Sequence, residues 1–519
     1  MYELSIALKY LVPRLRYLSV SIISVISIFV IATVVWLTIV FFSATEGLEQ
    51  RWTQKLIAIT APVRLIPTDS YYRSYYYNSD AISEASHFTS KTLAEKLRSP
   101  ITDPYNPEID PALSKDFPKP LVDENGKSID LLKAALQAIQ EVQGAKNLSI
   151  STFETAFANV HIRLVRPSHL GTQEASTQLL TQASYLMNFD PEKKNLDTIL
   201  LPQTAEDREN CERIQEEMGI TSTLSIEKHD TQWLLPMNAT LGQGVLLPKS
   251  FRDAGVKTAD SGYFSYFSAG ATALQEQRLP FFVAGFYDPG IIPIGGKLIL
   301  TTENVVSLVQ SASLAQDTLF PTGINVNFSN YKNAEKVKSE IQQNLKKRGL
   351  TGFFTVESYD HYDFTKDIFQ QLKSEKNLFS LISVIIVIVA CSNIISMLVI
   401  LVHDKEKEVA ILRALGATKA SIGFVFGLCG FLMGALGSII GAIIAYFTVK
   451  NLPLLLAFLG KLQGFDVLNA SFYGTSIPTE VSIYSVFLVV IATAVVSTLA
   501  GIVAAFKASH QNTSDALRE

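Results

Sequence analysis

Four stretches of this chain contain no Asp, Glu, Lys or Arg, and they set the pattern of its 519 residues. They are Leu18–Phe42, Leu378–Val402, Ile422–Val449 and Val481–Phe506. Each exceeds the roughly 20 residues that a helix needs to cross the hydrocarbon core of a bilayer. The pattern therefore predicts one membrane helix, a long polar segment and then three more membrane helices.

The first span is expected to remain in the mature protein as an anchor. It is longer than the apolar core of a secretory signal peptide, which has about 7–15 residues, and no compact A-x-A-like cleavage site follows it closely. Basic residues gather in the short loop between the second and third spans, at Lys405, Lys407, Arg413 and Lys419. Others, such as Arg51, lie near the opposite ends, so the bias is moderate; it favours a cytoplasmic loop and cytoplasmic termini.

The predicted fold class is a membrane protein with four transmembrane helices (1+3) and a large α+β extracytoplasmic domain between the first and the second. A channel or secondary transporter would usually show more spans. The predicted segments are a cytoplasmic N-terminal segment 1–17, transmembrane helix 18–43, extracytoplasmic domain 44–377, transmembrane helix 378–402, cytoplasmic loop 403–421, transmembrane helix 422–449, periplasmic loop 450–480, transmembrane helix 481–506 and cytoplasmic tail 507–519.

Within the long segment, β-branched and aromatic runs predict strands, and apolar residues at helical spacing predict helices. The predicted strands are Phe157–Arg166, Leu279–Tyr287, Lys297–Thr301 and Ile324–Asn327, and the predicted helices are Leu131–Val142, Asp207–Met218, Ala334–Arg348 and Phe364–Lys376. We expect Glu46–Ala58 to extend the first span outward, as Phe364–Lys376 leads into the second. The Tyr/Ser-rich run Ser70–Asp80 and the Pro-rich run Ser99–Pro120 are expected to be irregular loops.

Composition agrees with a membrane protein and points away from an enzyme. Hydrophobic residues make up 48% of the chain, and the net charge of −4 gives no reason to expect nucleic acid. The Gly126-Lys-Ser sequence has Leu121 where a phosphate-binding loop needs its first glycine, so the chain itself should not bind ATP. His161 and His169 lack metal ligands at suitable spacing. We expect no catalytic site, metal or cofactor in this chain.

The third span carries a glycine seam, at intervals of four, three, four, three and four residues: Gly423, Gly427, Gly430, Gly434, Gly437 and Gly441. Small residues allow helix backbones to approach closely in lipid. Tight packing against the second and fourth spans is the expected role, with a sliding surface as the alternative. Asn393 in the second span is expected to form an interhelical hydrogen bond. No span contains a carboxylate, which argues against ion-coupled transport.

The loop between the second and third spans is the most specific motif. Its apolar stripe is followed by Gly416 and Thr418, which offer a helix stop and restart. By periodicity alone, such a loop could simply lie at the headgroup interface. The amino-acid sequence of the loop, however, resembles the coupling-helix signature of FtsX-like ABC permeases: Lys405-Glu-Lys-Glu-Val-Ala-Ile-Leu-Arg-Ala-Leu-Gly-Ala-Thr418. The resemblance assigns the coupling to an ATPase to Glu408, Ile411, Leu412, Arg413 and Gly416.

The resemblance extends to lipoprotein-releasing permeases of the LolC/LolE type. Their motifs are similar to Leu241–Val256, Phe282–Tyr287, Leu372–Asn377, Cys391–Ser396 and Asp515–Glu519. This resemblance implies an inner-membrane complex of two permeases, paralogous or identical, with a separate ATPase that binds ATP-Mg. The complex would extract acylated lipoproteins, whose acyl chains would face the first two spans, and would pass them to a periplasmic carrier.

In that family a hairpin of one permease recruits the carrier. The corresponding stretch here is Phe264–Pro280, with Gly270 and Pro280 as turn-prone positions and without the family's proline-rich tip. The candidate carrier contacts in it are Ser268, Gly270, Gln277 and Arg278. Two alternatives remain open: an FtsX-like permease that transmits force to an extracytoplasmic partner, and a tripartite-efflux or lipid-export permease.

Overall fold

A computed structural model describes most of the chain. The described residues are 18–99, 103–123, 125–142, 148–166, 176–191, 193, 196–230, 232–269, 273–290, 295–312, 322–404, 409, 411, 416–464 and 483–509. They divide into two compact units. Unit one comprises Met1–Arg51 and Gln370–Glu519, and unit two comprises Trp52–Phe369.

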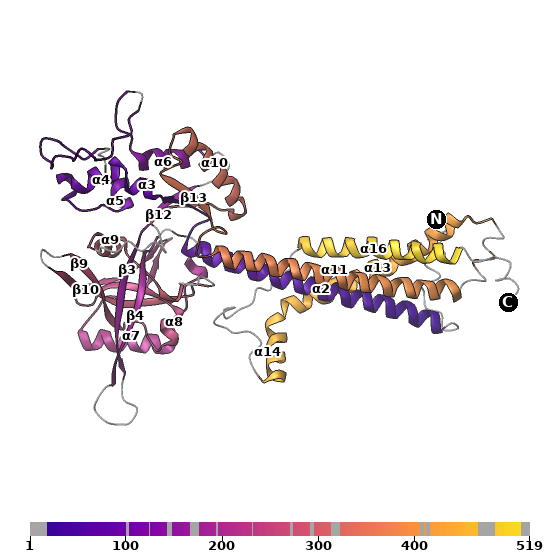
Figure 1. The fold of residues 1–519 in the computed structure, drawn as a ribbon. Helices are drawn as coiled ribbons and strands as arrows, with labels where there is room; N and C mark the ends of the chain where they lie inside the picture. Colours follow the sequence, from indigo (N-terminus) through magenta and orange to yellow (C-terminus); the bar gives the residue numbers. More distant parts are fainter. Residues whose placement is uncertain are drawn as a thin grey trace. The chain divides into compact units, whose positions relative to one another are not determined.

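Unit one is built from long apolar helices (Figure 1). They are α2 (Leu18–Ile59), α11 (Lys366–Asp404), α13 (Lys419–Lys450) and α16 (Ile483–Ser509), with the shorter α14 (Leu452–Gln463) after α13. Among the described residues, three helical stretches are long and apolar enough to cross a membrane: Val25–Ile59, Ala420–Lys450 and Val486–Val503. The second predicted span lies within α11, so it is helical as expected.

Two of these helices cross the boundary between the units without a break. α2 continues past Arg51 to Ile59, and α11 begins at Lys366, before Gln370. The predicted helical continuation of the first span through Glu46–Ala58 and the predicted helix leading into the second span are therefore confirmed.

Unit two contains two larger sheets, as expected for an α+β domain (Figure 1). The four-stranded antiparallel sheet has the order β13 (Phe354–Ser358), β1 (Val63–Pro67), β12 (Gly323–Asn327), β2 (Ser149–Phe153). Its apolar side chains share a core with α6 (Leu131–Gln140) and α10 (Ala334–Lys347).

The seven-stranded sheet is mixed, with parallel pairs β10–β8 and β11–β4. Its order is β10 (Leu274–Tyr287), β9 (Ser261–Ala269), β3 (Thr155–Arg166), β4 (Ser176–Asn188), β11 (Leu298–Thr301), β8 (Gly242–Pro248) and β7 (Met237–Asn238). Helix α9 (Glu303–Ala312) packs its Val305, Val306 and Val309 into the core of this sheet. All four predicted strands and the helix α7 (Ala205–Met218) are present, with shifted ends.

The prediction for the tyrosine-rich run was wrong. Ser70–Asp80 forms most of two short helices, α3 (Asp69–Tyr72) and α4 (Tyr75–Ile82). Tyr71 is fully buried and Tyr76 nearly so, because their rings pack into the core beside β1 and α6. The Pro-rich run behaves as predicted, since residues 103–120 contain neither helix nor strand.

Candidate functional site

The loop between α11 and α13 is described in part. Glu408, Leu412 and Arg413 lie outside the described residues. Ile411 is helical and 53% exposed. Val409 is partly buried and packs against the apolar cluster of unit one. At these two described residues the loop therefore contacts the bundle through Val409 and leaves the Ile411 side chain exposed.

The loop ends in a defined turn. Gly416 has φ +100°, a conformation that favours glycine, and open space surrounds it. Thr418 caps α13, because its hydroxyl accepts a hydrogen bond from the Ser421 backbone N–H at 3.1 Å. The predicted helix restart at Thr418 is thus confirmed, whereas the predicted stop before Gly416 falls at 412–415, outside the described residues.

The glycine seam of α13 faces two different helices. Methyl groups built at Gly427, Gly430 and Gly434 would first meet α16, whereas those at Gly437 and Gly441 would first meet α2. The expected packing against the fourth span is seen at the first three of these glycines, the nearest atoms at the last two belong to the first span, and contact of the seam with the second span stays a prediction. The seven-residue repeat turns slowly around a straight helix, so its two halves reach different neighbours. A methyl group built at Gly423 would meet no atom of the described residues within 4 Å, and the Asn393 side chain lies outside those residues.

The C-terminal end of α2 is anchored inside unit two. Leu56, Ala58 and Ile59 are buried in one apolar cluster with Tyr287 and Leu298 of the seven-stranded sheet. This burial ties the last turns of the helix to the sheet.

Two lysine side chains contact the same end of the helix. Lys55 forms an ion pair with Asp288, and both side chains are at most one-fifth exposed. Burial alone would raise the pKa of Asp288, but hydrogen bonds from Lys55 and the Gly290 backbone N–H lower it below its usual value. Lys193 donates to the carbonyl of Thr60. Sequence reasoning missed these contacts, because 233 positions separate Lys55 from Asp288.

Helix α11 has corresponding contacts in both units. In unit two the Thr365 hydroxyl donates to the Tyr359 carbonyl at 2.9 Å, and Phe369 packs edge-on against Tyr359. In unit one Lys376 pairs with Glu49 of α2 at 3.0 Å. The two boundary-crossing helices are therefore joined to each other as well as to their own units.

The predicted hairpin is present as the antiparallel pair β9–β10, whose last described pair is Ala269 with Leu274. Gly270 lies outside the described residues. Gln277 donates to the Ser268 hydroxyl at 3.3 Å, and Arg278 pairs with Glu276 at 3.1 Å. Pro280 does not form a turn, because it lies within β10 opposite Tyr263. Phe267 and Leu274 leave apolar surface exposed near the hairpin end.

One group in unit two has ligand atoms close enough for a metal ion. The ligand atoms of Glu335, Asp360 and His361 lie within 4.8 Å of one another. His361 already contacts Asp360 at 3.1 Å, and Lys338 pairs with Glu335 at 3.3 Å. These pairs satisfy the charges locally, and we assign no metal to the group.

The C-terminal part of the chain is similar to a known protein family. Residues 380–513 match the family model described as FtsX-like permease C-terminal. The chain is 32% identical over 153 residues to the "Lipoprotein-releasing system transmembrane protein LolC" of Haemophilus influenzae, covering 29% of this chain and 36% of the relative. The protein of the same name from Xylella fastidiosa (strain Temecula1) is 25% identical over 240 residues, covering 46% and 55%.

A third relative of that name, from Neisseria meningitidis serogroup B, is 28% identical over 154 residues, covering 30% of this chain and 37% of the relative. The chain thus matches about a third to just over half of the length of these curated relatives. These matches confirm the resemblance to LolC/LolE-type permeases, and they give the chain an FtsX-like permease domain that contains α11 from residue 380 onward, α13 and α16.

Proposed function

We propose that this chain is the permease subunit of an ATP-driven ABC complex that extracts acylated lipoproteins from the bacterial inner membrane and hands them to a periplasmic carrier. The observation that carries the proposal is that the FtsX-like match at 380–513 covers most of α11, the loop between α11 and α13, and the helices α13 and α16. A separate ATPase would bind ATP-Mg, and the second permease would be a paralogue or an identical copy. The loop and both termini would lie in the cytoplasm, with unit two in the periplasm and four helices spanning the membrane.

The loop would receive the movement of the ATPase. Ile411 is exposed for contact with a partner, and Val409 rests on the apolar cluster of unit one. Glu408, Leu412 and Arg413 would complete the partner surface. A displacement of this loop would reach α13 through the turn at Gly416 and the cap at Thr418.

The helices then offer a stiff path outward. The glycine seam joins α13 to α16 and to α2 at close range. Helix α2 continues to Ile59, where its buried end and the Lys55–Asp288 pair fix it in unit two. A closely packed interior transmits displacement rather than absorbing it. The movement of the loop would therefore be passed on to the periplasmic domain.

Exposed apolar side chains supply a surface for the lipoprotein acyl chains. On α11 a stripe at helical spacing, Leu378, Leu381, Ile385 and Ile388, is at least half exposed in the isolated chain. Phe29 of α2 is 71% exposed. The hairpin residues Ser268, Gly270, Gln277 and Arg278 are the proposed contacts for the carrier.

A second candidate is an FtsX-like permease that drives an extracytoplasmic partner without moving lipid. The observation that favours it is the anchoring of α2 in unit two, which force transmission also requires. A permease for tripartite efflux or lipid export would use the same coupling.

Identification of the partners separates these candidates. The tagged chain is purified in mild detergent, and the co-purifying proteins are identified by mass spectrometry. A stand-alone ATPase with acylated lipoproteins supports lipoprotein release. An ATPase with a wall-acting protein and no lipoprotein favours force transmission, and the absence of any ATPase contradicts both.

A pair of matched variants tests the coupling. Gly416→Val forces a β-branched residue into φ +100°, whereas Gly423→Val places the same side chain in a helix with equal open space around it. We expect Gly416→Val to uncouple ATP hydrolysis from lipoprotein release in reconstituted membranes, with insertion intact, and Glu408→Lys to act similarly. If Gly416→Val releases lipoprotein as well as Gly423→Val does, the coupling role of this turn is refuted.

A further inference from the structure

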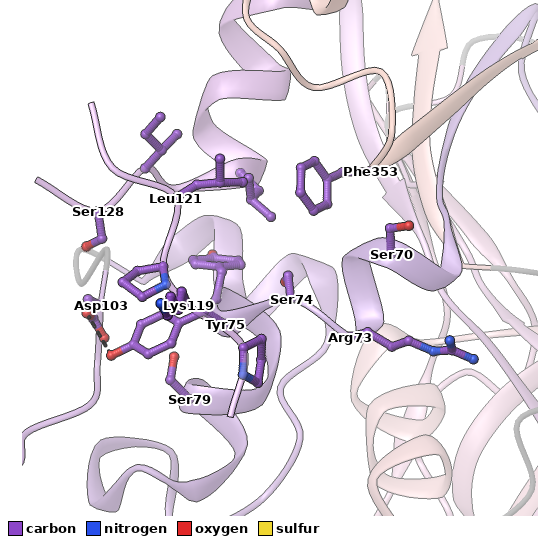
Figure 2. Close-up of a pocket in the computed structure, with 15 residues that line it drawn as sticks. Ser70, Arg73, Ser74, Tyr75, Ser79, Asp103, Lys119, Leu121, Ser128 and Phe353 are labelled. Atoms are coloured by element: carbon purple, nitrogen blue, oxygen red, sulfur yellow. Dashed lines mark hydrogen bonds between the residues drawn. The ribbon is translucent and has the colours of Figure 1, made fainter. Parts of the chain in front are cut away.

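A cavity of about 330 Å³ lies in unit two, and all of its lining residues except Phe353 precede the permease-like motifs (Figure 2). Helix α4 lines one side of it, and the segment around Lys119 and Leu121 lines another. Its volume is at the lower end of the range for small-molecule sites. The FtsX-like match at 380–513 does not include this region, and the proposed transport cycle does not use it.

One end of the cavity contains a buried hydroxyl group that has no partner. Ser79 of α4 is fully buried, and its Oγ makes no hydrogen bond within the described part of the chain. Leaving such a group unsatisfied costs about 1–3 kcal/mol. In Figure 2 this oxygen points toward the side of the cavity where Tyr75 lies. A bound molecule with a hydrogen-bond acceptor would satisfy it.

The charges around the cavity favour an anion. Lys119 and Arg73 both line it, and the side chains of both lack ion pairs and hydrogen bonds within the described residues. Among the described lining residues, the one other charged group is Asp103, whose carboxylate accepts from the Tyr75 hydroxyl at 3.4 Å and from the Tyr105 backbone N–H at 3.2 Å. In Figure 2 Lys119 lies beside Tyr75, whereas Arg73 extends outward. Lys119 is therefore the cation placed to pair with a ligand.

Tyr75 is a neutral neighbour at physiological pH. Burial, together with the nearby Asp103 carboxylate, raises the pKa of Tyr75 to about 12. Its ring therefore adds no negative charge that would oppose an anion.

The opposite end of the cavity is apolar. Leu131 is buried there, and Phe353 and Leu121 complete the lining. Figure 2 shows Phe353 on the side away from Asp103 and Ser79. The cavity thus has a polar end with a hydroxyl and an ammonium group, and an end that can enclose a compact apolar body.

We infer that this cavity is a binding site for a small organic carboxylate, with the carboxylate between Lys119 and Ser79 and the apolar body toward Phe353. The inference is independent of the proposed transport function. A charge-assisted hydrogen bond to Lys119 and a hydrogen bond from Ser79 would fix the carboxylate.

The test uses the full chain in lipid nanodiscs and 4-fluorobenzoate as the probe, observed by fluorine NMR. Empty nanodiscs correct for partition into lipid. Neutral 4-fluorobenzamide and cationic 4-fluorobenzylamine are the matched probes. We expect saturable line broadening with benzoate, at least fivefold weaker binding of benzamide, and no saturable binding of benzylamine.

Two variants locate the site. Lys119→Glu changes an exposed side chain and should weaken benzoate binding at least tenfold, with benzamide binding little changed. Ser79→Ala should weaken benzoate binding about threefold without lowering the thermal midpoint, because it removes an unsatisfied hydroxyl. Failure of the wild-type chain to bind benzoate, equal binding by Lys119→Glu, or preference for benzylamine would each overturn the inference.

Discussion

Replacement of Gly430 by alanine should disrupt the packing between α13 and α16. A methyl group at this position would lie 2.3 Å from the Ser497 carbonyl oxygen and 3.2 Å from its carbon. Because non-bonded contacts to carbon are favourable at about 3.5 Å, the two helices would have to separate by roughly 1 Å. The obstacle is backbone, so no change of rotamer can relieve it.

The magnitude follows from two opposing effects. Overpacking of this kind costs about 1–3 kcal/mol. Alanine otherwise favours a helix over glycine by about 0.5–1 kcal/mol. We therefore expect a net loss of about 1–2 kcal/mol for Gly430→Ala. Gly423→Ala is the matched control, because nothing lies within 4 Å of its added methyl group, so it should be neutral or slightly stabilising.

The neighbouring cysteine provides an assay that reports on this helix pair. Cys429 is fully buried in the apolar cluster of unit one. In a background in which Cys211 and Cys391 are replaced by serine, it is the one remaining thiol of the chain's 3 cysteines. Its labelling on heating in detergent therefore measures the opening of the bundle.

We expect the half-labelling temperature of Gly430→Ala to fall by about 2–8 °C relative to the parent, on the scale for a unit of this size. Gly423→Ala should not lower it. Equal temperatures for the two variants would refute the argument that the seam is a close-packed contact at Gly430.

Three further predictions concern charges. Burial raises the pKa of Glu154 to about 8 despite hydrogen bonds from backbone N–H groups, so the folded state holds this proton more tightly than the unfolded state does. The free energy of unfolding should therefore fall as the pH rises from 4.5 to 8. Glu154→Gln should remove this decline, which is on the order of 4 kcal/mol, in thermal unfolding measured across that pH range. Lys55→Met should lower the free energy of unfolding by about 2 kcal/mol, because it leaves the Asp288 carboxylate without its cation. Since the folded state lowers the pKa of Asp288, the difference in unfolding free energy between the variant and the parent should shrink as the pH falls through that pKa. Lys376→Ala should change the thermal midpoint little, since the pair with Glu49 is more than 40% exposed at both side chains and such pairs contribute about 0–1 kcal/mol.

Four strands of unit two could be predicted from the sequence, because β-branched and aromatic residues are concentrated in each of them. β3 and β11 appear within two residues of their predicted starts, since β-branched and aromatic residues fill both. The tyrosine-rich run was not predictable in the same way. A run such as Tyr75-Tyr-Tyr has no clear periodicity, and only the core beside β1 and α6 decides that Tyr71 and Tyr76 turn inward.

The loop between α11 and α13 could also be predicted from local sequence, whereas the neighbours of the glycine seam could not. Gly416 and Thr418 act locally, through a backbone dihedral angle and a hydrogen bond three residues away, so their turn could be inferred from the sequence. Glycine spacing showed that the third span packs closely, but not which helix it meets. That choice depends on where the other helices lie around it.

The sequence by itself determined where the apolar helices lie, where the chain turns and which family its loop resembles, because these depend on neighbours along the chain. Only the tertiary structure decided that α2 ends in the core of unit two, that Lys55 meets Asp288 and that Ser79 and Lys119 line one cavity. These contacts join residues far apart in sequence, and their energies depend on burial and distance, which no local pattern encodes.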